Sequence, residues 1–154
     1  MKSKITFIAL IGLLALASCK NTESDVLQQA RLTQQGLVSK KQSLMTELDN
    51  RYKQVEQEIA TASTSVSSDT TRDVSSEILF MEEEKSAIDE LRDKVENWAI
   101  TNIVLLPEPG QLKNDPKFKD LKDEDVLKMV KDQDSIFSIL KSEIESELLL
   151  YEDF

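Results

Sequence analysis

The sequence predicts an all-α protein: an elongated, antiparallel three-helix bundle that contains a coiled-coil-like hairpin. Three observations carry this prediction. Only three glycines and three prolines occur in 154 residues, so the chain offers few turn residues for a fold built of strands. Good helix formers, above all Leu, Lys, Glu, Gln and Ala, are plentiful. Apolar residues also recur at intervals of three and four along three long segments, as they do in helices with one buried face.

The first helix is predicted over residues 26–62. Its buried seam advances in steps of three and four through Leu27, Ala30, Gln34, Leu37, Lys41, Leu44, Leu48, Tyr52, Val55, Ile59 and Ala62. From Lys41 to Tyr52 the steps form an 11-residue repeat, which locally unwinds a left-handed supercoil. Because Gln34 and Lys41 are polar and Gly36 weakens a helix, we expect the N-terminal half to pack loosely and to face a partner. Replacing Gln34 and Lys41 by Leu is then expected to raise thermal stability.

A connector and a second helix are predicted next. Residues 61–71 contain eight Ser or Thr, which favour bonds from side chain to backbone over a regular helix. The second helix is predicted over residues 74–106, and its apolar face broadens towards the C-terminal end. The residues of its seam are Met81, Glu84, Ile88, Leu91, Val95, Trp98, Asn102 and Leu105. Trp98, the only tryptophan, is expected in the core, and Pro107 and Pro109 end the helix because proline cannot continue it.

The third helix is predicted over residues 116–151. Asp115 and Pro116 have the character of an N-cap and a first-turn residue, and the main part of the helix is expected to start within residues 123–125, whose carboxylates suit a positive helix end. The apolar set is Val126, Val130, Phe137, Leu140, Ile144, Leu148 and Tyr151. Further apolar residues are expected to widen this face, namely Leu127, Met129, Ile136, Ile139, Leu149 and Leu150.

The sequence offers no catalytic constellation, no metal site and no cofactor motif. Histidine is absent, so neither the usual general base nor the commonest metal ligand is available. Asp132, Asp134 and Glu143 match positions 1, 3 and 12 of a calcium loop, but Phe137 stands where such a loop needs glycine. The acidic runs at residues 82–84 and 123–125 are expected to be solvated faces or helix N-terminal charges. We therefore expect a protein that is not an enzyme.

The N-terminus has the three parts of a secretory signal. Lys2 and Lys4 precede an apolar run of 13 residues, from Ile5 to Ala17, which is too short to span the ~30 Å of a bilayer core comfortably. The signal ends in the sequence Leu16-Ala17-Ser18-Cys19.

This ending resembles the lipobox of bacterial lipoproteins. The resemblance implies that residues 1–18 are a signal peptide, that the thiol of Cys19 carries a diacylglyceryl group, and that its amine is acylated, for example with palmitate. Lys20 stands where the enterobacterial inner-membrane signal has Asp, which implies the outer membrane. Residues 19–25 are then a lipidated tether, in which Thr22 and Asp25 have the spacing of a helix-capping pair, and residues 26–154 are the helical domain. In the connector, Asp69-Thr70-Thr71 resembles an O-glycosylation acceptor pattern of Bacteroidota; whether Thr70 or Thr71 is modified stays open.

The net charge and the length of the chain limit the classes of function that this protein can have. Cleavage before Cys19 leaves 154 − 18 = 136 residues with 17 basic and 29 acidic side chains, a balance that argues against nucleic-acid binding. Membrane attachment is then expected through the lipid on Cys19. The expected function is a lipid-anchored, non-enzymatic cell-envelope protein that acts as a structural or protein-interaction module, with a protein partner or self-association. The alternatives are a small-ligand or metal carrier with a pocket between the second and third helices near Trp98, and a surface-exposed adhesin. Excess apolar surface at residues 100–106 and 148–151 would favour a protein partner.

Overall fold

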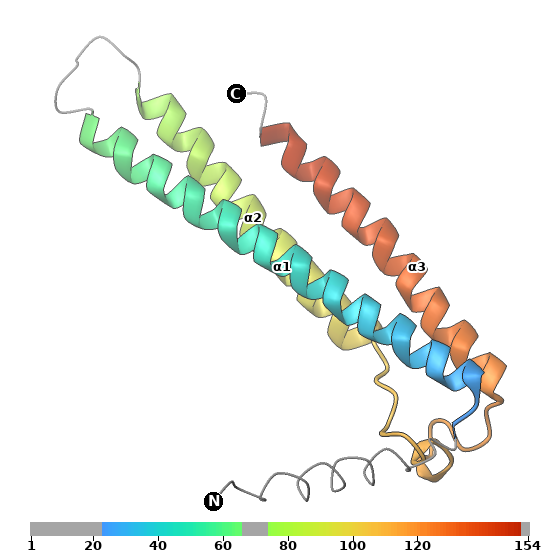
Figure 1. The fold of residues 1–154 in the computed structure, drawn as a ribbon. Coiled ribbons are helices and arrows are strands. Elements are labelled where there is room, and N and C mark those ends of the chain that lie inside the picture. Colours follow the sequence, from blue (N-terminus) through green and yellow to red (C-terminus); the bar gives the residue numbers. More distant parts are fainter. Residues whose placement is uncertain (1–22, 66–73, 152–154) are drawn as a thin grey trace, which may run out of the picture.

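The computed structural model describes residues 23–65 and 74–151, which form three long helices and no strand. Helix α1 spans Asp25–Ser65, α2 spans Val74–Asn102 and α3 spans Asp123–Leu148. Two 3-10 turns, η1 at Leu112–Asn114 and η2 at Leu149–Tyr151, complete the described elements. Helix α2 runs back along α1, and α3 then runs in the same direction as α1 (Figure 1). The predicted all-α, three-helix architecture is thus confirmed.

Helix α1 is the common packing partner of the other two helices. Both α2 and α3 contact it extensively, whereas they contact each other much less. Charge gives a physical reason: α1 carries five acidic and five basic residues, but α2 and α3 each carry eight acidic and only three basic ones. Like charges disfavour close contact between α2 and α3. Lys94 of α2 offsets part of this repulsion, since its Nζ lies 3.9 Å from Glu143 and 3.6 Å from Glu147 of α3.

The seam predicted for α1 is confirmed along its whole length. Seven of its eleven positions are buried, and the other four, Lys41, Tyr52, Ile59 and Ala62, are half-buried. The expectation that the N-terminal half packs loosely is wrong. Leu27, Ala30 and Leu37 are at most 8% exposed, because α3 and the α2–α3 connector cover this half. Helix α1 also runs three residues past its predicted end at 62. Its Ser and Thr side chains bond back to the helix's own carbonyls there, for example Thr61 Oγ1 to the oxygen of Gln57 at 2.8 Å, instead of breaking it.

Gln34 explains why α2 ends at Asn102 and not at 106. Its Nε2 donates to the carbonyl of Val104 at 2.8 Å, and its Oε1 accepts from the amide of Leu106 at 3.1 Å. Pro107 has no N–H to continue the helical ladder, and residues 103–106 instead run as an irregular segment held by Gln34. The predicted burial of Leu105 is therefore wrong, since this side chain is 66% exposed.

Helix α3 begins at Asp123, within residues 123–125 where the start of its main part was predicted, and seven residues after the overall start predicted at 116. Asp115 caps a separate turn: its Oδ1 accepts from the amide of Lys117 at 2.8 Å, and its carbonyl accepts from the amide of Phe118 at 3.0 Å. The turn folds Phe118 inward until only 1% of its surface is exposed. Lys113 Nζ then donates to the carbonyl of Leu121 at 2.6 Å. A continuous helix from residue 116 would lose the burial of Phe118 and the hydrogen bond from Lys113 to Leu121.

Two clusters form the core. The larger one fills the middle of the bundle, and the smaller one packs Leu27, Ala30 and Val126 against Phe118 and Leu112 of the connector. The second cluster closes the end of the bundle at which α1 and α3 begin, and we call this end the base.

Two predictions about individual core positions need correction. The sequence places Glu84 both in the seam of the second helix and in an acidic run expected to be solvated. The second expectation is wrong, since Glu84 is 2% exposed and accepts a hydrogen bond from Arg51 Nε at 2.6 Å. Trp98, expected in the core, is half-buried. Its ring centroid lies 5.1 Å from that of Phe137 on α3, so it contributes to the limited contact between α2 and α3.

Candidate functional site: an uncovered seam on α3

A second seam lies on the outside of α3 and continues into η2, which contains its last residue. Its residues follow one another in steps of three, four, three and four: Ile136, Ile139, Glu143, Ser146 and Leu150. All five side chains are exposed, and Ile136, Ile139 and Leu150 are 50%, 61% and 68% exposed. We call these five residues the outer seam. Alternation of three and four is the spacing with which one helix packs against another.

The outer seam arises because α3 has more apolar residues than its contacts with α1 can cover. Val126, Val130, Phe137 and Ile144 take up the buried face, and each is fully buried. The outer seam lies roughly a third of a turn away from that face at ~100° per residue. The expectation that Leu149 widens the buried face is wrong, since it is 57% exposed. The same expectation is wrong for Ile136, Ile139 and Leu150. They form a strip of their own.

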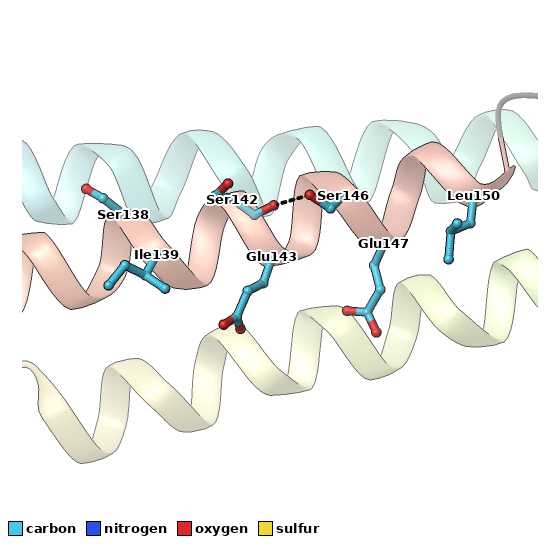
Figure 2. A pocket seen from close by; sticks show the side chains of 7 residues that line it. All are labelled: Ser138, Ile139, Ser142, Glu143, Ser146, Glu147 and Leu150. Atoms are coloured by element: carbon cyan, nitrogen blue, oxygen red, sulfur yellow. Dashed lines mark hydrogen bonds between the residues drawn. The ribbon is translucent and has the colours of Figure 1, made fainter.

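The outer seam borders a shallow, open hollow on the surface of α3 (Figure 2). Its floor is low because the side chains of Ser138, Ser142 and Ser146 are short. Ser146 Oγ donates to the carbonyl of Ser142 at 2.8 Å, so its hydroxyl has a partner within the helix. Ile139 and Leu150 stand at the two ends of the hollow. This shape leaves room for another helix to approach the α3 backbone closely.

Charge in the hollow is negative. Glu143 and Glu147 point from α3 towards α2 (Figure 2), and both lie near the single ammonium group of Lys94. These three side chains are about half exposed, between 45% and 59%. Two carboxylates that share one lysine retain one uncompensated negative charge, and exposure to water keeps these pairs weak. The hollow can therefore accept a further cation.

The base of the bundle holds the chain just after the predicted tether. Arg31 Nε donates to Glu23 at 2.7 Å, a second N–H of Arg31 reaches the other oxygen of the same carboxylate, and a third contact joins Arg31 to the carbonyl of Pro107 at 2.6 Å. The hydrogen bond from Arg31 lowers the pKa of Glu23 below its ordinary value of 4.5, against the effect of burial. Ser24 Oγ bonds Asp123 at 2.6 Å and caps α1 through the amide of Leu27.

The sequence-predicted site residues fall in three places. Cys19 and its cleavage motif Leu16-Ala17-Ser18 lie outside the described residues, as do Thr22, Thr70 and Thr71. The residues that match a calcium loop, Asp132, Asp134 and Glu143, all lie on the unbroken helix α3. Oδ1 of Asp134 is 2.7 Å from Nζ of Lys40. Trp98 does not line the hollow on α3.

Two further observations concern the described parts of the chain. Across residues 23–65 and 74–151, no three His, Cys, Asp or Glu side chains gather as the ligands of a metal ion would. Within the same ranges, none of the helices combines the length and the apolar character needed to cross a bilayer.

The isoleucines of the outer seam were missed in the sequence because they lie beside stronger buried positions, whereas its last residue, Leu150, falls within residues 148–151, where excess apolar surface was considered. The signal that reveals the outer seam is the separate three-four spacing from Ile136 to Leu150, which only becomes distinct once the buried face is known. Comparison with protein-family models, with curated proteins and with solved structures finds no match to this chain. The excess apolar surface that would favour a protein partner is present at both expected segments, with Ile100 and Leu105 81% and 66% exposed and Leu149 and Leu150 57% and 68% exposed. The outer seam joins the second of these segments to Ile136 and Ile139.

Proposed function

We propose that this protein is a lipid-anchored, non-enzymatic interaction module of the cell envelope. Lipid on Cys19 attaches it to a membrane, the outer one by the sequence signal at Lys20, and its outer seam binds another protein. The observation that supports the second part most directly is the exposure of Ile136, Ile139 and Leu150 in helical register. Single exposed apolar residues are common on soluble proteins, but here they recur with the three-four spacing that lets one helix pack along another.

The construction of the base supports the anchoring part of the proposal. Glu23 lies four residues after Cys19, so the two are at most ~14 Å apart even in an extended chain. The bonds of Arg31 to Glu23 and to Pro107 tie this point to the α2–α3 connector. A lipid on Cys19 would therefore hold the base close to the membrane, and the 41 residues of α1 would extend the bundle by about 60 Å.

The anchor is tested by the variant Cys19→Ala. Wild-type protein is expected to incorporate a clickable palmitate analogue and to be cleaved before Cys19, whereas Cys19→Ala should show neither. Labelling of the variant would refute lipidation at this residue. A melting curve of the variant serves as a control, because the described core clusters contain only residues after Cys19 and the substitution should leave them intact.

The interaction part is tested by cross-linking in native envelopes followed by mass spectrometry. We expect lysine-directed links between this chain and a second protein, and we expect them on the α2–α3 side, with Lys94 and Lys141 as reactive groups. Links confined to one chain, with intact protein that remains monomeric in light scattering, would contradict an interaction module.

A further inference from the structure

We infer that the partner is a basic amphipathic helix of another protein, which lies along the outer seam as a fourth helix of the bundle. This inference rests on the proposed function, because it names the partner chemistry of an interaction module. The outer seam runs over 15 residues from Ile136 to Leu150, about 21 Å of helix. A partner helix of about four turns would match this length and cover all three apolar residues.

The residue at the third position of the outer seam, Glu143, determines which charge the partner helix must carry. Glu143 occupies a place in the outer seam where an apolar residue would otherwise pack, and it lies between Ile139 and Leu150. A polar residue at such a place costs stability but determines which partner fits. The counterpart of Glu143 on the docked helix is therefore Lys or Arg, since Lys94 at 3.9 Å from Glu143 is already shared with Glu147. Apolar residues of the docked helix would then meet Ile136, Ile139 and Leu150.

Long-range charge favours the same partner. Helices α2 and α3, which border the site, each carry eight acidic and three basic residues, so a cationic helix is attracted before contact is made. Of the three basic residues of α3, Lys141 is the one closest in sequence to Glu143, and its Nζ pairs with Glu145 at 3.1 Å. The outer seam itself contains no basic residue.

The same charges argue against a second copy of this chain as the occupant. Two outer seams brought together would place two strongly acidic α3 helices side by side. Neither seam contains a basic residue that could pair with Glu143 of the other copy. Like charges at an interface cost several kcal/mol and so exclude a partner. Among helical partners, the structure therefore favours a basic helix from a different protein.

The test uses a photo-crosslinking phenylalanine analogue in place of Ile139 in the full lipidated chain, within native envelopes. Leu32, an exposed leucine of α1 at 68% exposure, receives the same analogue as a matched control site. We expect position 139, and not position 32, to link to a segment of another protein that is rich in Lys or Arg and has apolar residues at helical spacing. A link from 139 to another copy of this chain, to an acidic or non-helical segment, or no link above the control, would overturn the inference.

A charge-reversal pair separates the seam from general electrostatics. Glu143→Lys in the photo-crosslinking chain is expected to lower the yield at position 139 about tenfold, because it sets like charges opposite each other. Glu96→Lys changes the net charge equally at an exposed position of α2 and should leave most of the yield. Equal losses in both variants would show that overall charge, and not the outer seam, governs binding, and would refute the inference. If lysine-directed links to another protein persist while position 139 is silent, the proposed interaction function stands and this inference alone fails.

Discussion

Gln34→Leu should destabilise the protein, although the substitution places a more apolar side chain of similar helix propensity in a buried seam. Gln34 is only 8% exposed, and its amide satisfies both the carbonyl of Val104 and the amide of Leu106. Leucine can satisfy neither group. Leaving a buried polar group unpaired costs about 1–3 kcal/mol, so two such groups cost about 2–6 kcal/mol. Burying the leucine returns about 1.5–3 kcal/mol, and the midpoints of the two ranges give a net loss of about 2 kcal/mol.

Lys41→Leu is the matched control. Lys41 lies seven residues further along the same seam and is half-buried, so its replacement adds apolar contact and should leave stability unchanged or slightly higher. Urea unfolding followed by circular dichroism gives both free energies of unfolding. Hydrogen exchange adds a local readout, since the amide of Leu106 should exchange faster in Gln34→Leu and at the wild-type rate in Lys41→Leu. If Gln34→Leu stabilises the protein as much as Lys41→Leu does, and Leu106 stays protected, the assigned role of Gln34 is refuted.

Three further predictions follow from local geometry. Gly36→Ala should raise the free energy of unfolding by about 1 kcal/mol, because a Cβ at this helical position meets nothing within 4 Å; no gain in a urea titration would show that α1 is not a regular helix there. Arg51→Met should lower stability by about 3 kcal/mol, since it leaves the carboxylate of Glu84 buried without its cation; a double variant with Glu84→Leu should recover most of the loss, and an unchanged melting temperature in the single variant would contradict the buried pair. The pKa of Glu23 is lowered by Arg31, so the pair's contribution is complete above pH 4.5 and is lost as the pH falls from there through the lowered pKa; stability against pH should therefore lose part of its acid slope in Glu23→Gln, and an unaltered slope would speak against this assignment.

The sequence was sufficient to predict the helices and their buried faces. Steps of three and four along α1 depend only on the helical repeat, and every one of those positions proved to be buried or half-buried. The acids at residues 123–125 were likewise placed in the first turn of α3, because their attraction to a helix N-terminus is local. The ends of the helices were harder to predict. Residues 103–106 could have continued α2 on propensity alone, and a side chain 70 residues away holds them in another conformation.

Only the tertiary structure decided which helix lies between the other two and which apolar residues stay uncovered. From the sequence, Gln34 was expected to weaken the packing of the seam, yet it forms hydrogen bonds with the carbonyl of Val104 and the amide of Leu106. Ile136 and Ile139 looked like core residues, yet α1 covers a different face of α3 and leaves them in solvent. A periodic pattern shows which face of a helix is apolar, but whether that face is covered depends on contacts between segments distant in sequence. For this protein, the sequence alone thus determined three amphipathic helices, and the packing of α2 and α3 on a neutral α1 created the outer seam.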